Sequence, residues 1–219
     1  MNDLGVIIFG AGLQDSLNPC IFMTCAVFLA QGIYLPLGSL GLARIRSFFV
    51  LVYLLCFMFF NFGPAQIFLF NKGFILTAKI LYLALGLGAF VLGVLLLKDW
   101  FFIRRGSPAA TLADEKAKSF TANGVVVYLI SLVLAVVLSA LATLWPINNY
   151  VMLLGNEAFL HGQWLKVMLL IIGYAIISMW PFWIIWAFIS IKNLRPSLSK
   201  IVCASIFFVA SSCMIFIFK

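Results

Sequence analysis

The chain has 219 residues, 65% of them hydrophobic and only 9% charged, with a mean hydropathy of +1.20 and a formal net charge of +8 at pH 7. This composition excludes a soluble domain of this size, because apolar runs of about eighteen residues or more recur along the chain. The apolar-polar alternation typical of a transmembrane barrel is absent from the sequence. We therefore predict an all-α integral membrane protein.

Six spans are predicted, and the basic residues between them are shared unevenly between the two sides of the membrane. Loops on one side carry ten lysines and arginines and those on the other carry four, which by the positive-inside rule places both termini outside. This asymmetry indicates a multi-pass protein of the inner (cytoplasmic) membrane, surrounded by lipid, and explains the positive charge without a nucleic-acid partner. The spans are residues 4–32, 46–70, 74–97, 122–146, 164–190 and 200–218.

The first span is longer than one straight crossing needs and contains the stretch Asp15-Ser16-Leu17-Asn18-Pro19-Cys20. Pro19 cannot donate a hydrogen bond to the carbonyl of Asp15, and its ring crowds that carbonyl, so a kinked or broken helix is predicted. An acid, an amide and a thiol at membrane depth are costly and typical of a functional site. Asp15 and Asn18 are expected to bond the freed backbone groups.

The next spans contain a second break and a face of small residues. Asn61-Phe62-Gly63-Pro64-Ala65-Gln66 interrupts the second span. In the third, small residues four apart, in the pairs Ala84/Gly88 and Ala89/Gly93, favour close packing against neighbouring helices. The only long polar segment follows, with five basic and three acidic residues, and is predicted to be a cytoplasmic linker at residues 98–120.

The linker separates two halves that resemble each other. In the fourth span, Thr143-Leu144-Trp145-Pro146-Ile147 aligns with Ser16 to Cys20, and Pro181 of the fifth span corresponds to Pro64 of the second. Because each half has three spans, the second copy would lie inverted in the membrane. We predict two inverted three-helix repeats, at residues 1–97 and 121–219, with proline-broken first and fourth helices. Their breaks, including Pro146 and Asn148, would meet near the midplane.

The five cysteines all lie in apolar spans, so no disulfide framework is expected. Cys56, Cys203 and Cys213 are interpreted as small buried hydrophobic residues. A single histidine, His161, and Glu157 in an outer loop do not make a metal site, and no cofactor motif is found.

The stretch Gly12-Leu13-Gln14-Asp15-Ser16-Leu17-Asn18-Pro19-Cys20 resembles the first-helix motif of the CcdA/DsbD transmembrane thiol–disulfide carriers, the six-helix proteins of cytochrome c biogenesis. This resemblance implies a reducing relay from a cytoplasmic thioredoxin-like protein to thiol proteins outside. Cys20 would be the first catalytic thiol, supported by Asp15, Asn18, Pro19, Pro146 and Asn148. A thiolate would attack a disulfide sulfur and a second thiol would resolve the mixed disulfide.

The sequence departs from that family at the second thiol, because Ile147 stands at the fourth-helix position. Cys25 is a candidate replacement, but residues five apart on a regular helix point about 140° away from each other. Whether the chain is an active oxidoreductase therefore stays open. One alternative is a small-solute or ion transporter on the same scaffold, with Asp15 as the coupling group. Another is a non-catalytic subunit of a membrane assembly.

Overall fold

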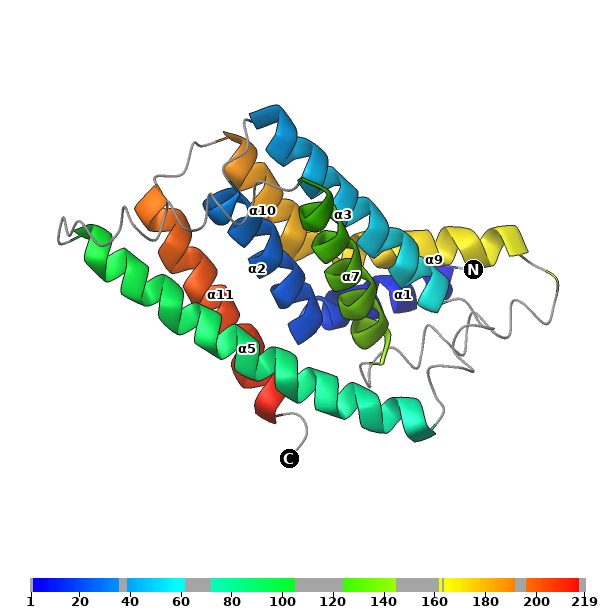
Figure 1. Cartoon of the computed structure of the whole chain (residues 1–219). Helices are drawn as coiled ribbons and strands as arrows, with labels where there is room; N and C mark the ends of the chain where they lie inside the picture. Colours follow the sequence, from blue (N-terminus) through cyan, green and yellow to red (C-terminus); the bar gives the residue numbers. More distant parts are fainter. Residues whose placement is uncertain are drawn as a thin grey trace.

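A computed structural model describes residues 2–35, 39–61, 72–104, 124–144, 162, 164–191 and 196–216, which form eight α-helices and no strand (Figure 1). The prediction of an all-α chain is confirmed for these residues. The helices are α1 (Asn2–Asp15), α2 (Pro19–Tyr34), α3 (Ser39–Phe60), α5 (Lys72–Arg104), α7 (Gly124–Thr143), α9 (Trp164–Ser178), α10 (Trp180–Ile191) and α11 (Pro196–Phe216).

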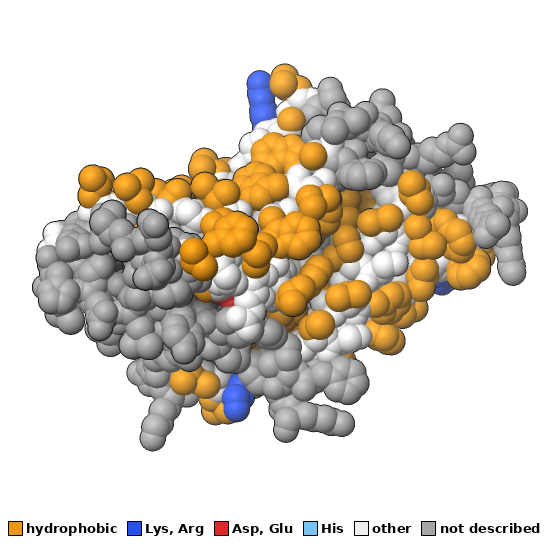
Figure 2. Space-filling model, turned by 180° about the vertical axis from the view of Figure 1, so that it is seen from behind, with side chains coloured by type: hydrophobic (Ala, Val, Ile, Leu, Met, Phe, Trp, Pro, Cys, Tyr) orange, Lys and Arg blue, Asp and Glu red, His pale blue; other side chains and the backbone are white. Residues whose placement is uncertain are grey.

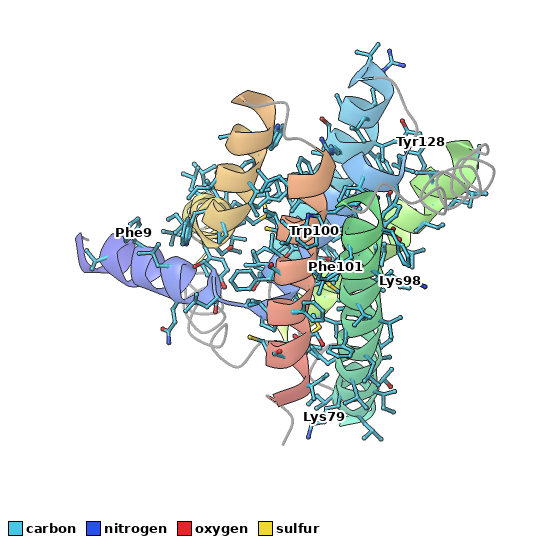
Figure 3. The ribbon with its side chains drawn as sticks, turned by 90° about the vertical axis from the view of Figure 1, so that its left-hand side faces the viewer. Phe9, Lys79, Lys98, Trp100, Phe101 and Tyr128 are labelled. Atoms are coloured by element: carbon cyan, nitrogen blue, oxygen red, sulfur yellow. The ribbon has the colours of Figure 1, made fainter. Side chains whose placement is uncertain are left out.

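Four helices among the described residues are long and apolar enough to cross a membrane alone: α3, α5, α7 and α11. Two bent pairs meet the same condition together, α1 with α2 at 63° and α9 with α10 at 54°. If each bent pair is one span, the total is six, as predicted. Figure 3 shows Lys79 and Lys98 towards opposite ends of α5. These two lysines are nineteen residues apart, which corresponds to about 28 Å along the helix. That length is close to the roughly 30 Å hydrocarbon core of a bilayer.

The positions of the helix breaks agree with the sequence only in part. The first span is interrupted between Asp15 and Pro19, as Pro19 predicts. In the second half the bend that the structure describes lies in the fifth span, at Met179, whereas α7 runs unbroken to Thr143. The predicted fourth-helix break at Pro146 and the second-span break at Pro64 lie outside the described residues. Helix α5 continues to Arg104, into the range predicted as linker, and residues 105–123 also lie outside them.

Helix α2 occupies the centre of the bundle, in contact with α3, α7, α10 and α11. Around it α5 packs along α11, α3 packs along α7, and α1 packs against α9 (Figure 1). Glycines allow α5 and α11 to approach closely: a Cβ on Gly93 would lie 3.2 Å from the Phe208 ring, and one on Gly86 would lie 3.1 Å from Met214. The core is therefore built around the segment that follows the first break.

The outer faces of the described helices are mostly apolar, and Figure 2 shows hydrophobic side chains over much of one face with few charged ones. Leucines there are more than half exposed, including Leu51 of α3, Leu76 of α5 and Leu165 of α9. Exposed apolar area on this scale is expected where lipid, and not water, surrounds the protein. The class of a multi-pass membrane protein follows from these faces together with the span lengths.

Candidate functional site at the break of the first span

The break between α1 and α2 is a turn that the sequence stabilises locally. Helix α1 ends at Asp15, and the amide of Asn18 donates to the Asp15 carbonyl over 2.9 Å. Pro19 then occupies the first turn of α2, where its missing N–H costs nothing. The Asn18 side chain caps the new helix, since its Oδ1 accepts from the amide of Cys20 at 2.9 Å. Cys20 therefore lies in the first turn of α2.

Asn18 also joins this break to the other half of the chain. Its Nδ2 donates to the carbonyl of Ala142 over 3.0 Å, and Ala142 lies in the last turn of α7. Carbonyls at a helix end lack partners within the helix, so Asn18 satisfies one of them. The end of α3 meets the same turn, because Asn61 Nδ2 lies 3.4 Å from the Thr143 hydroxyl. The structure thus brings the first break to the end of the fourth span.

Three buried tyrosines from three helices surround the break. Tyr174 of α9 donates to Oδ2 of Asp15, and Tyr82 of α5 donates to the carbonyl of Leu141 while its hydroxyl faces the Cys20 thiol. Tyr53 of α3 lies beside Thr24 and within electrostatic range of Asp15 and Cys20. None of the three rings is more than 2% exposed. They turn the break into an enclosed polar cluster.

Two oxygens in this cluster have no hydrogen-bond partner. Asp15 is 1% exposed, and only its Oδ2 is bonded, which leaves Oδ1 unpartnered. The Tyr53 hydroxyl makes no well-formed hydrogen bond, and the Thr24 hydroxyl beside it donates to the carbonyl of Cys20. A buried polar atom without a partner costs free energy, so these atoms mark a place suited to a further donor or acceptor.

No two thiols are joined in a disulfide. All five cysteines of the chain are free, and Cys20, Cys25 and Cys203 are buried. Helix α2 is continuous through Cys20 and Cys25, so the divergence expected from their spacing applies and the two cannot form an unstrained bridge in this conformation. Cys203 donates to the carbonyl of Ala26 over 3.4 Å. Among the described residues no group of three His, Cys, Asp or Glu side chains could hold a metal ion.

The structure thus brings together Asp15, Asn18, Pro19 and Cys20 of the predicted site, while Cys25 lies further along α2. Pro146, Ile147 and Asn148 lie outside the described residues. The tyrosines were missed from the sequence. Their positions could have indicated them, because Tyr53, Tyr82 and Tyr174 fall inside apolar spans. A tyrosine hydroxyl at such a depth needs a polar partner.

The fold and the site define an all-helical membrane protein with an enclosed polar cluster at a helix break. No protein-family model, no curated protein and no solved structure matches the chain. The function is therefore argued from the cluster itself.

Proposed function

We propose that the chain is a membrane thiol–disulfide carrier that passes reducing equivalents from the cytoplasm to extracytoplasmic thiol proteins, with Cys20 as the reactive group. The observation that carries the proposal is the place of Cys20 in the first turn of α2, directly after the break. The positive end of a helix dipole stabilises a thiolate. The Tyr82 hydroxyl lies beside the same sulfur, but its proton is donated to the carbonyl of Leu141. The helix end therefore favours the nucleophilic form, and the burial of the sulfur opposes it until the bundle opens.

The chemistry is a one-thiol exchange that needs a dithiol donor and a disulfide acceptor. The Cys20 thiolate attacks one sulfur of the acceptor disulfide, forming a mixed disulfide and releasing the other acceptor sulfur as a thiolate. One thiolate of a cytoplasmic, thioredoxin-like dithiol then attacks Cys20 Sγ and releases the second acceptor thiol. The donor's remaining thiol resolves its own mixed disulfide and frees the Cys20 thiolate. In sum the donor dithiol becomes a disulfide and the acceptor disulfide becomes two thiols.

Cys20 is fully buried, so the exchange requires the bundle to open alternately to each side. Two inverted repeats would provide such a motion, and part of the helix pairing agrees with them. In such repeats the second span corresponds to the fifth, and the fourth span corresponds to the first. The contact between α3 of the second span and α7 of the fourth therefore predicts a contact between the fifth and first spans. Helices α9 and α10 do contact α1 and α2. The excess of basic residues on one side supports cytoplasmic placement of that side, with both termini outside.

Trapping of the mixed disulfide tests this proposal. Membranes from cells that express the intact chain are quenched with acid, alkylated and separated on a diagonal gel. A reductant-sensitive adduct with a soluble thiol protein is expected for the wild type and for Cys25→Ser, which keeps the same helix and loses a buried thiol elsewhere. The adduct is expected to be absent from Cys20→Ser. An adduct that persists without Cys20 contradicts the proposal.

A second candidate function is proton-coupled transport of a small solute or ion. The observation in its favour is the buried carboxyl of Asp15 with an unpartnered Oδ1, within electrostatic range of the buried Tyr53 hydroxyl. An acid so deep in an apolar bundle is a candidate proton carrier. Proteoliposomes loaded with a pH-sensitive dye and given a potassium diffusion potential measure the proton flux directly. Transport predicts that Asp15→Asn abolishes the flux and Cys20→Ser preserves it, whereas the thiol carrier predicts no flux in either.

A further inference from the structure

A second region of the bundle, apart from the polar cluster, is hollow. Helices α2, α5 and α7 enclose a partly open groove with a cavity of about 400 Å³, and Phe207 of α11 also lines it. That volume falls within the roughly 300–1,000 Å³ usual for small-molecule sites. The walls are almost wholly apolar and include Met23, Val27, Leu85, Leu92, Ile130 and Leu134. A long hydrocarbon chain is the complement of such walls.

Small residues on α5 make the room for this groove. Ala84 and Gly88 line it, and a Cβ built on Gly88 meets no atom within 4 Å. By contrast Gly93, on another face of α5, is tightly packed against Phe208 of α11. The sequence interpretation that Ala84 and Gly88 serve close helix packing is therefore wrong for the described residues, since this pair faces open space. In two inverted repeats, the counterpart of the α2–α11 contact would be a contact between α5 and α7. The groove lies between these two helices.

The groove contains one polar side chain whose hydrogen bonding is incomplete. Gln31 of α2 donates through Nε2 to the Ser131 hydroxyl of α7 over 3.3 Å. Gln31 is only 8% exposed, it lines the groove, and its Oε1 has no partner. Within a membrane-embedded groove, water is scarce and an unpaired acceptor is costly. The site is therefore short of one hydrogen-bond donor.

We propose that this groove binds a single-chain amphiphile, a long alkyl or isoprenyl chain whose head group carries a hydroxyl. The chain lies against the walls of α2, α5 and α7, and the hydroxyl donates to Oε1 of Gln31. A donor is required because Oε1 is an acceptor. The ester oxygens of ordinary phospholipid chains only accept hydrogen bonds, so such a chain fills the groove but leaves Oε1 unpaired.

The position of the polar pair suits the orientation of an amphiphile. Gln31 lies in the last turn of α2, which ends at Tyr34, so the hydroxyl binds near the end of a membrane helix. Met23, in the second turn of α2 and so towards the other end of that helix, and Phe207, in the middle of α11, also line the groove. The binding site does not depend on the reaction at Cys20, and it stands whether or not the chain is a thiol carrier.

A photocrosslinking competition tests the proposal with the intact chain in phosphatidylcholine vesicles. The probe is hexadecanol with a diazirine in its chain, and labelled peptides are mapped by mass spectrometry. Labelling is expected to concentrate on the groove faces of α2, α5 and α7. Unlabelled hexadecanol is expected to compete at a concentration about fivefold or more below that of its methyl ether, because the ether cannot donate to Gln31.

Three variants separate a built site from general contact with lipid. Gly88→Leu fills the groove and is expected to reduce labelling of the groove at least fivefold, whereas Gly10→Leu keeps the wild-type pattern. Gly10 is the matched control because a Cβ there also meets nothing within 4 Å. Gln31→Leu is expected to keep labelling but to abolish the preference for the alcohol over the ether. Equal labelling of the lipid-facing side of α3 overturns the proposal, as does equal competition by alcohol and ether in the wild type.

Discussion

The two helix breaks among the described residues are stabilised by different kinds of hydrogen bond. At the fifth-span break the hydrogen bonds between residues that the structure describes are local: Ser178 donates to the carbonyl of Ala175 at 3.1 Å, and the Trp183 amide donates to Met179 at 3.2 Å. At the first-span break the side chains reach other helices. Asn18 bonds Ala142 of α7, and Asp15 accepts from Tyr174 of α9.

This difference distinguishes the fifth-span break, which is only a bend in the chain, from the first-span break, which carries the candidate site. Local hydrogen bonds remain intact when one helix moves against another, so the fifth-span break can move as a unit with its own helices. The bonds at the first break cross between the two halves of the chain and would have to break if the halves moved apart. A motion that separates the halves to expose Cys20 would therefore have to break the Asn18 and Tyr174 hydrogen bonds, whichever of the two proposed functions it served.

The largest effect is expected from Asn18→Leu, which is similar in volume but has neither the cap nor the bond to Ala142. The variant should lose about 2–3 kcal/mol of unfolding free energy, from a lost N-cap and a lost interhelical hydrogen bond. Unfolding in mixed micelles by titration with sodium dodecyl sulfate measures it. Asn18→Ser is the dissecting control: it keeps a capping oxygen but cannot reach Ala142, so its loss should be intermediate. Equal losses in both variants would show that the contact between halves adds nothing.

Gly12→Ala tests the packing that holds the two bent spans together. A Cβ on Gly12 would lie 2.8 Å from Cγ2 of Ile177, one residue before the end of α9. We expect overpacking to cost about 2 kcal/mol in the same titration. Gly10→Ala, on the same helix but with nothing within 4 Å of its Cβ, should instead be neutral or gain up to about 1 kcal/mol from helix propensity. A stable Gly12→Ala variant would mean that α1 is not fixed against α9.

Tyr174→Phe leaves the carboxyl of Asp15 buried and without its donor. The expected cost is about 1–2 kcal/mol, smaller than for Asn18 because one hydrogen bond is lost and no cap. The matched control is Tyr53→Phe, which removes an equally buried hydroxyl that makes no well-formed hydrogen bond and should cost less than about 0.5 kcal/mol. If the two variants lose equal stability, the Asp15–Tyr174 bond contributes nothing beyond packing.

How far the sequence predicted this structure depends on the range of each interaction. The first break and its cap follow from Asn18, Pro19 and the amide of Cys20, which are neighbours in the chain, so elementary backbone chemistry was enough. The apolar spans were equally predictable because their length is set by the bilayer. Both depend on residues within a few turns of each other.

Features that depend on which helices become neighbours were not predictable. The spacing of Ala84 and Gly88 indicates a face of small residues, but only the arrangement of α5 and α7 decides whether that face packs or opens. The convergence of Tyr53, Tyr82 and Tyr174 has the same cause, since the three lie on separate helices. Periodicity within one helix carries no information about its partner.

The smallest effect on stability is expected at the fifth-span break, where the side-chain hydrogen bond is local. Ser178 is fully buried, and its hydroxyl donates only to the carbonyl one turn back, a group that helix geometry can satisfy in other ways. Ser178→Ala should therefore change the unfolding free energy by less than about 0.5 kcal/mol. A loss as large as that of Asn18→Leu would show that this bend also supports a site. A negligible loss would leave the first break as the one whose polar side chains hold the two halves together.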